Sequence, residues 1–369
     1  MGSDKKHNTM KIRVLLASFA VLAAASCAKN NIDSSKADRQ VIIFDSPVMA
    51  AATKGANEIT TFPQTQSFVV FAHYYPYLYT SYADGKPYMD NVTVAFDPSL
   101  AKDGAWAPVP TNYYWPAQGS LTFAAYSPVE GVGKVEYDDS GFSFEGFTVK
   151  VDPAEQIDLL FSERTYNQAA YSYDPDDDIP YEGVQINFLH ALSSVRFEIK
   201  ADKVLVDGTN ANRYEFRVKN VTLKGVHNKG SFDQNLPIAG INQTTPAPTE
   251  RDWKIDAGSQ LTEFQVHSGE VIIDSEDSYN LAGTDDTNLI LIPQSLDQVS
   301  IHIKYDMRHS GMAADEWVED STAEASLSTS KVSHWLRGKR YTYTLTLGLN
   351  EIKFAPKVET WITVPNFDL

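Results

Sequence analysis

The chain of 369 residues contains a single cysteine, Cys27, which argues against a disulfide framework or a cysteine-based metal site. It also lacks a long apolar run. The longest one, near the start, is far shorter than the roughly 20 residues needed to cross a bilayer. The HxH and HExxH patterns of zinc sites are missing, and so are GxSxG and a glycine-rich phosphate loop. The sequence therefore predicts neither an enzyme nor a protein with a metal or another cofactor.

Basic charge is also scarce. Residues 1–26 hold four basic residues and one acidic residue, so the chain from Cys27 onward carries 27 Lys and Arg against 47 Asp and Glu, a net charge of −20. A surface of this charge repels nucleic-acid phosphates and anionic lipid headgroups. We therefore expect no nucleic-acid partner, and any attachment to a membrane should be covalent.

Residues that favour strands and turns dominate what is present. Aromatic residues make up 12% of the chain, and its 18 prolines and 20 glycines suit short strands joined by turns. The apolar runs Val41–Phe44 and Phe68–Phe71 are typical of strands buried on both faces. Elsewhere apolar and polar residues alternate, and the alternation shifts phase across Gly146 and Asn220, which predicts a β-bulge at each. The predicted class is all-β. Strands with one buried face are predicted at residues 195–199, 301–307 and 341–347.

The segment before Cys27 has the three parts of a secretory signal peptide. Lys11 and Arg13 precede an apolar run of about a dozen residues, and the small residues 24–26 lead to Cys27. Small residues directly before a cysteine resemble the bacterial lipobox, in which the thiol is lipidated and the cysteine becomes the mature N-terminus. We expect export and a lipid anchor at Cys27. The alternative is an ordinary signal peptide with an incidental cysteine.

Composition also divides the rest of the chain. Residues 28–40 are polar and are expected to form a flexible tether behind the lipid. A stretch rich in proline and acidic residues at 171–183 separates two halves that are dense in strand signals. We predict a signal peptide at 1–27, an N-terminal β-sandwich domain at 41–175 and a C-terminal β-sandwich domain at 176–369.

Three patterns could carry chemistry, and for each we favour a structural interpretation. His190 follows an apolar pair, which is more typical of a hydrogen-bonded structural histidine than of a metal ligand. Ser328 and Lys331 match the SxxK pattern of a serine nucleophile, but its companion motifs are missing. The acidic residues of 174–178 could bind calcium, yet the prolines around them are typical of a solvated linker.

Tyrosines are concentrated between Tyr74 and Tyr88. Interleaved tyrosines can form a stacking platform for a glycan or a protein partner. They also occur in hairpins whose amphipathic rings cover the edge of a core, and we favour this interpretation. The stacking-platform interpretation leaves an alternative function open, that of a monomeric surface lipoprotein that binds glycans through Tyr74–Tyr88.

Eight short motifs follow one another along residues 40–365. They are WP at 115–116, LTFAAYSP at 121–128, DLLF at 158–161, FLHALS at 188–193, LIPQ at 291–294, WLRGKRYTY at 335–343, IKF at 352–354 and VETW at 358–361. Each is weak alone, but their order and the lipobox make the set specific. Together they resemble the fimbrillin family of Bacteroidales, of the Mfa-like type.

The resemblance implies two β-sandwich domains of transthyretin-like, Greek-key type, in a non-enzymatic lipoprotein of the outer membrane. Such proteins are subunits of a surface pilus with a role in adhesion. A trypsin-like protease removes an N-terminal strand, and the groove left behind accepts a strand from the next subunit. Because this contact is head-to-tail, it extends into a filament. The implied partners are other pilus subunits and, through the lipid, the outer membrane.

The resemblance also assigns roles to residues of this chain. The removable strand would consist of four consecutive apolar residues: Val41, Ile42, Ile43 and Phe44. Lys54 would be the processing site, although the family's protease prefers arginine. Arg39 precedes the strand, so a cut there would leave the strand in place. An unprocessed anchor or tip subunit is therefore the alternative to a stalk subunit. The donor strand is expected near Val358–Val364.

Overall fold

The structure, a computed structural model, describes residues 40–49, 62–100, 104–170, 183–207, 213–234, 252–282, 288–349 and 352–361. The chain divides into two compact units, Met1–Gln40 and Val41–Leu369, and all the elements below belong to the second. Cys27, Arg39 and Lys54 lie outside the described residues, as does the acidic stretch of 174–178.

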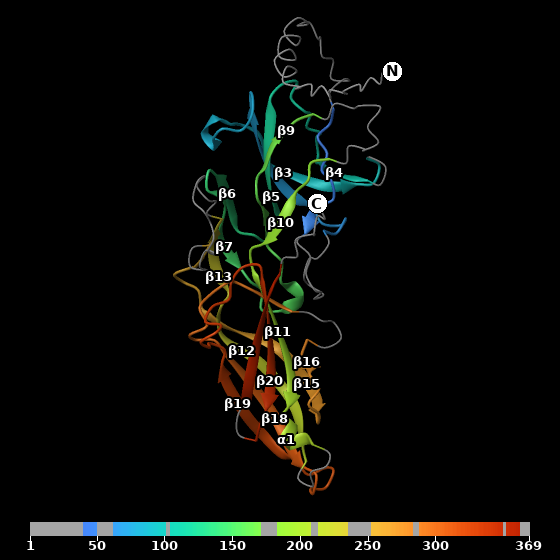
Figure 1. Cartoon of the computed structure of the whole chain (residues 1–369), viewed down its shortest axis with the longest axis vertical. Helices are drawn as coiled ribbons and strands as arrows, with labels where there is room; N and C mark the ends of the chain where they lie inside the picture. The colour runs from blue at the N-terminus through green and yellow to red at the C-terminus, as the bar shows by residue number, and fades with distance from the viewer. Residues whose placement is uncertain are drawn as a thin grey trace, which may run out of the picture. The chain divides into compact units, whose positions relative to one another are not determined.

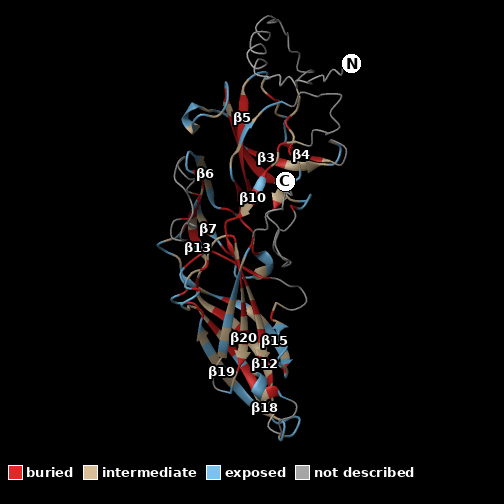
Figure 2. Cartoon of the chain, viewed as in Figure 1, coloured by how far each residue is buried: buried red, intermediate tan, exposed pale blue. Residues whose placement is uncertain are grey.

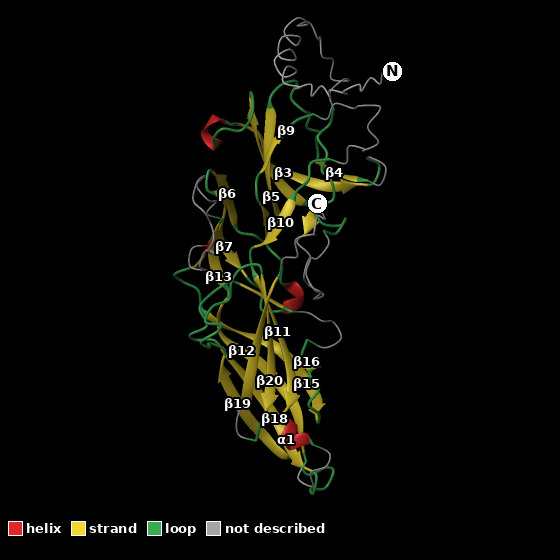
Figure 3. Cartoon of the chain, viewed as in Figure 1, coloured by secondary structure: helices red, strands yellow, loops and turns green. Residues whose placement is uncertain are grey.

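Strands make up nearly all the regular structure of the described residues, as Figure 3 shows. They form four sheets, in which most neighbouring strands are antiparallel. The helical elements that lie wholly within the described residues are single turns: η2 (Tyr82–Asp84), η3 (Pro153–Glu155) and α1 (Lys203–Val206). The predicted all-β class is therefore confirmed.

The first sheet has eight strands in the order β1-β10-β8-β5-β2-β3-β4, with β9 also paired to β5 (Figure 1). Its strands are β1 (Val48–Met49), β2 (Phe68–Tyr75), β3 (Lys86–Asp97), β4 (Ala105–Pro108), β5 (Ser120–Ser127), β8 (Leu160–Ser162), β9 (Thr165–Gln168) and β10 (Asn187–His190). The apolar run Phe68–Phe71 lies in β2 and is buried on both faces, as predicted. Figure 2 shows buried residues concentrated in these central strands.

A second sheet joins the two halves of the chain that the sequence separates. Its order is β14-β13-β7-β6. The strands β6 (Lys134–Asp138) and β7 (Gly141–Thr148) precede residue 175, whereas β13 (Lys229–Asp233) and β14 (Trp253–Ile255) follow it. The register between β7 and β13 shifts opposite Gly146, which has a φ of +71°, so the predicted bulge there is confirmed.

Two further sheets enclose the core of the C-terminal half. One has the order β16-β11-β20-β21, with β17 also paired to β11, and the other β15-β12-β18-β19. Their strands are β11 (Ser193–Ala201), β12 (Tyr214–His227), β15 (Leu261–Ile273), β16 (Tyr279–Asn280), β17 (Leu289–Leu291), β18 (Ser300–His309), β19 (Val318–Ser326), β20 (Lys339–Leu347) and β21 (Ile352–Thr360). The second bulge predicted is present, because β12 shifts register between Val218 and Asn220.

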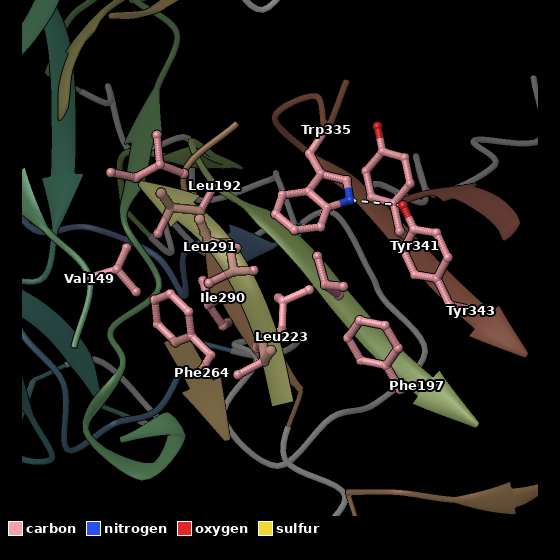
Figure 4. Packing of buried hydrophobic residues seen from close by; sticks show 14 of the residues in the cluster. Val149, Leu192, Phe197, Leu223, Phe264, Ile290, Leu291, Trp335, Tyr341 and Tyr343 are labelled. Carbon is pink, nitrogen blue, oxygen red and sulfur yellow. Dashed lines mark hydrogen bonds between the residues drawn. The ribbon is translucent and has the colours of Figure 1, made fainter. Parts of the chain in front are cut away.

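The core between these sheets is aromatic and aliphatic (Figure 4). Phe197 from β11 stacks on Tyr343 from β20 with ring centroids 5.4 Å apart, and the indole N–H of Trp335 donates to the Tyr343 hydroxyl at 3.0 Å. The three predicted alternating strands correspond to β11, β18 and β20, whose apolar residues face this core.

The domain boundary predicted between residues 175 and 176 stays a prediction, since residues 171–182 are outside the described set. Strand pairing crosses that position in the second sheet, and β10 also pairs with β8 in the first sheet. The backbone N–H of Val149 also donates to the Asn228 carbonyl at 2.8 Å, across the same position. The two halves are therefore joined by hydrogen bonds as well as by the chain.

Replacing Phe232 by alanine tests this connection. The Phe232 ring lies 5.9 Å from that of Phe144 and 5.0 Å from that of Phe161, both from before residue 175. Because the ring is fully buried, Phe232→Ala should lower the free energy of unfolding by about 3–5 kcal/mol in one cooperative transition. The exposed Lys254, on the neighbouring strand β14, is the control. Lys254→Ala should change the free energy of unfolding by less than about 0.5 kcal/mol.

Urea unfolding followed by near-ultraviolet circular dichroism and by tryptophan fluorescence provides the measurement. Two separate transitions, of which only one shifts in Phe232→Ala, would contradict the expected coupling of the halves.

Candidate functional site

Residues 41–44 lie against the open side of β4. Phe44 and Trp106 exchange backbone hydrogen bonds, with Phe44 N–H donating at 2.8 Å and Trp106 N–H donating back at 3.0 Å. The N–H of Ile42 donates to the Tyr113 carbonyl at 2.8 Å, and both contacts are antiparallel. The segment thus pairs with the outer strand β4 at one end of the first sheet.

The same segment also bonds to the other end of that sheet. Val184 N–H donates to the Ile43 carbonyl at 2.9 Å, and Asp45 N–H donates to the Val184 carbonyl at 3.2 Å. Farther along, Val48 N–H donates to the Ile186 carbonyl at 2.9 Å, and β1 continues as a parallel neighbour of β10. Residues 41–49 therefore bridge β4 and β10, the two outer strands of the order β10-β8-β5-β2-β3-β4.

The side chains of the segment alternate between buried and partly exposed positions. Four of them are buried: Ile42, Phe44, Pro47 and Met49. The Phe44 ring meets the rings of Phe68 and Phe123 edge-on, with centroids 5.7 and 5.6 Å away. Val41 and Ile43 are only half-buried, so the expectation of burial on both faces is wrong for this run. One face points to the core because the segment lies at the rim of the sheet.

The chain re-enters the same core at Phe62. Its ring is 2% exposed, stacks on Phe188 at 5.4 Å and meets Phe68 edge-on at 5.7 Å. Residues 50–61, which include Lys54, are outside the described residues. A cut at Lys54 would therefore separate the buried Met49 from the buried Phe62 and leave the latter in the core.

A glycine makes the close approach of the segment to its neighbour feasible. Gly183 has a φ of +120°, and a Cβ atom there would lie 2.6 Å from the Phe44 carbonyl carbon and from the Asp45 nitrogen. A side chain at position 183 would thus both strain the backbone and push residues 44 and 45 away.

Two buried indoles beside the segment have no acceptor. The Nε1 atoms of Trp106 and Trp115 lack a hydrogen-bond partner among the described residues, as does that of Trp361, whereas those of Trp253 and Trp335 each have one. An unsatisfied buried donor costs about 1–3 kcal/mol. The apolar segment 41–44 offers these indoles no side-chain acceptor, so its polar contacts with the neighbouring strands come from its backbone.

The tyrosine-rich region covers one edge of the core, which is the interpretation favoured from the sequence. Arg164 holds it together: the side chain is 4% exposed, its Nε donates to the Tyr137 hydroxyl at 2.7 Å, and its guanidinium lies 5.1 Å from the Tyr82 ring centre. Burial raises the pKa of Tyr75 to about 12, and the neighbouring Tyr79 adds to this effect. Burial also raises the pKa of Tyr137, against the opposing effect of Arg164.

Two side chains of this region are exposed instead. Tyr77 is 84% exposed and Leu78 is 66% exposed, in the turn between β2 and η2. The turn is tied down where Asn167 accepts a hydrogen bond from the Tyr79 backbone at 2.6 Å. The region therefore presents a small apolar tip on a well-held loop.

His190 has the environment of a structural histidine. Its Nδ1 lies 2.9 Å from Asp158 Oδ2, both side chains are fully buried, and its ring stacks on Trp361 at 3.8 Å. Ser328 and Lys331 are not joined by a hydrogen bond between their side chains in the part of the chain that the structure describes. The SxxK pattern thus lacks the contact that activates a serine.

Within the described ranges, no group of three or more His, Cys, Asp or Glu side chains is placed to hold a metal ion. None of the described helices is long and apolar enough to span a membrane.

The expected donor segment is partly engaged within its own molecule. Val358–Thr360 belong to β21 and pair with β20, and Trp361 is fully buried. Residues 362–364 lie outside the described residues. Val358–Trp361 would have to leave their own sheet before they could serve as a donor.

The comparisons with known proteins assign a family. The sequence profile of the fimbrillin-like family matches residues 78–361, so the chain belongs to this family. This match confirms the resemblance noted from the motifs. Because this is a structural and adhesive family, the prediction that the chain is not an enzyme is also confirmed. A fimbrillin-like family is one of fimbrial proteins at the cell surface, and it implies other pilus subunits as partners.

Solved structures show the same fold. A fimbrial protein from Bacteroides vulgatus is 18% identical, with a TM-score of 0.56 over 87% of this chain and 99% of that one. A candidate cell adhesion protein from Bacteroides uniformis is 14% identical, with a TM-score of 0.51 over 89% of this chain and 100% of that one. At these identities the likeness concerns the fold alone. None of the curated proteins matches the chain.

Replacing Gly183 tests how residues 41–49 are held between β4 and β10. Gly183→Ala should loosen residues 41–49 and lower the free energy of unfolding by about 1–3 kcal/mol, because the methyl group meets the Phe44 and Asp45 backbone. Gly258→Ala is the matched control, since a Cβ atom there meets nothing within 4 Å.

Hydrogen exchange of the amides of residues 42–48 gives the local measurement. We expect faster exchange there in Gly183→Ala and no change in Gly258→Ala. Equal protection in both variants would show that the groove does not depend on this close approach.

Proposed function

We propose that this chain is an exported, lipid-anchored subunit of a surface pilus, assembled head-to-tail by donor-strand addition after removal of its N-terminal strand, with a role in adhesion. The observation that carries the proposal is the position of residues 41–49, which bond to both outer strands of the first sheet. Their removal would expose two open strand edges and an apolar groove. An extended strand from another subunit can pair with such edges and fill such pockets.

The domain architecture forms part of the proposal. We propose two β-sandwich domains of transthyretin-like, Greek-key type, at residues 41–175 and 176–369. The paired sheets around Phe197 and Tyr343 support the C-terminal sandwich. For the N-terminal domain, the support is a second core around Phe68 and Phe123, to which Val184, Ile186 and Phe188 also contribute.

The anchor and the processing site act on the same segment. Lipidation at Cys27 would tether the chain through residues 28–40 to the removable strand, so a cut at Lys54 would release the subunit from its lipid. A cut at Arg39 would also remove the lipid but keep the strand. The place of the cut thus decides between a building block with an open groove and a closed subunit.

Replacing the N-terminal strand by another strand costs less free energy than leaving the groove empty, because the strand's side chains are buried. Ile42, Phe44 and Met49 are each at most 6% exposed. Burying side chains of this size stabilises by about 1.5–3 kcal/mol each. A cut alone should therefore leave the segment in place, and an incoming strand would have to replace those contacts. The pilus forms by displacement in this proposal.

Lys54 variants test processing and assembly together. Lys54→Arg should be cut faster by an arginine-preferring protease and should then form a concentration-dependent ladder on unheated gels. Lys54→Gln should stay intact and monomeric, because the cut needs a basic side chain. Mass spectrometry of the mature N-terminus from native cells measures the cut: a lipidated Cys27 indicates an anchored subunit, and a start at Gly55 indicates a stalk subunit.

Cut protein that stays monomeric at every concentration would overturn assembly by strand addition. Cutting of Lys54→Gln at the same rate as the parent would instead place the processing site elsewhere.

A second candidate function, glycan binding by a monomer, rests on the exposure of Tyr77 and Leu78. A tyrosine held on a fixed loop can stack on a sugar ring. Tyr77→Ala should then weaken binding to immobilised neutral oligosaccharides about tenfold or more, as loss of a central aromatic contact does. Tyr279→Ala, at a 38% exposed tyrosine of the C-terminal half, is the control. Equal binding by both variants would exclude the tyrosine tip.

A further inference from the structure

The outer face of the sheet β15-β12-β18-β19 carries a cleft of about 380 Å³. Alternation along the strands makes this face polar: on β18, Ile301 and Ile303 are buried in the core, whereas His302 and Lys304 point outward. All four strands contribute to the lining. The cleft has the volume of a small-molecule site, and it is built on strands rather than on loops.

The strand register places three polar side chains in a row across the cleft. Lys304 of β18 lies between its pairing partners, Asn220 of β12 and Thr322 of β19. Three neighbouring strands span about 10 Å, so the row crosses the width of the cleft. Threonine is much shorter than lysine or glutamate, and Thr222 also lines the cleft. The surface is therefore hollowed between its longer side chains.

Two ion pairs flank this row. Lys224 Nζ lies 3.1 Å from Glu263 Oε1, and His302 Nε2 lies 3.0 Å from Glu324 Oε1. Such exposed pairs contribute little to stability, but they hold the two carboxylates at the cleft. Each carboxylate has a second oxygen that can accept a hydrogen bond from a ligand.

Lys304 is not paired in this way. Within the described ranges its ammonium group has neither an ion pair nor a hydrogen bond, and the same is true of the neighbouring Thr322 hydroxyl. Lys304 is exposed and offers three donors. The chain is strongly acidic and repels anions overall, so an unpaired cation in a polar cleft is where an anionic ligand would be held.

The lining matches a ligand with one negative charge and several hydroxyl groups. Lys304 can form a charge-assisted hydrogen bond with a carboxylate, while Glu263 and Glu324 can accept hydrogen bonds from hydroxyl groups. A phosphate group carries nearly two charges, and the same two glutamates would repel it. An acidic peptide would bring further negative charge and few hydroxyl groups.

The geometry points to this cleft as a binding site for an acidic sugar, which carries a single carboxylate among hydroxyl groups as sialic and uronic acids do. The inference goes beyond the proposed pilus assembly and does not depend on it. The four strands do not pair with residues 41–49 in the described structure, so removal of that segment should leave the cleft unchanged.

Removing the charge of Lys304 tests the site. Lys304→Gln should weaken the binding of an acidic sugar by about tenfold to a hundredfold, because it removes the charge-assisted contact. It should not affect folding, since the side chain is exposed. Lys304→Arg keeps the charge and should keep most of the binding. The matched control is Lys254→Gln, at an exposed lysine of the strand β14, which should bind as the parent does.

Isothermal titration calorimetry of the uncut full chain measures the Kd. The probes are sialyllactose, an unsulfated disaccharide with one glucuronic acid, and lactose, which lacks a carboxylate. We expect at least one acidic sugar to bind, and lactose to bind about tenfold more weakly or not at all. The two acidic probes distinguish a sialic acid from a uronic acid.

No binding of either acidic sugar at millimolar concentration, equal binding of lactose, or the same loss in Lys254→Gln would each overturn the inference. Tighter binding of inorganic phosphate or of a short aspartate peptide would do so as well. A loss in Tyr77→Ala but not in Lys304→Gln would place sugar binding at the tyrosine tip instead. Because the uncut chain is used, each of these results leaves the proposed pilus assembly standing.

Discussion

The N-terminal half of the structure depends on one short segment that is bonded on both sides. Without residues 41–49, the outer strands β4 and β10 of the first sheet would each present an open edge, and the pocket between Phe68 and Phe123 would be empty. Open edges pair readily with other chains. The fold is therefore complete only when an extended segment occupies this position, and the chain itself supplies one.

Much of the fold could be predicted from the sequence, because alternation and burial are local properties. The alternating strands at 195–199 and 341–347 and the bulges at Gly146 and Asn220 follow from side-chain spacing alone. The order of strands could not be predicted in this way. That β7 pairs with β13 across about 80 residues depends on the packing of Phe144 on Phe232, which no local pattern records.

The site shows the same division. The apolar run at 41–44 identified the segment, but its contacts with Trp106 and Val184 come from distant parts of the chain. The unsatisfied indoles could not be predicted either, since a sequence does not show which donors lack acceptors. Nor does it show that Gly183 allows the backbone of residues 44 and 45 to come so close. Arg164 gave no signal at all, although it holds the tyrosines in place.

The pairing of β21 with β20 has a mechanical consequence. The two strands are joined over nine residue pairs, and β21 ends at the buried Trp361. A tensile force that acts on residue 361 along the axis of β21 would load all of these pairs in shear at once. Shear requires many hydrogen bonds to break together, whereas peeling breaks them one at a time. This attachment would therefore resist pulling far better than a strand loaded from its side.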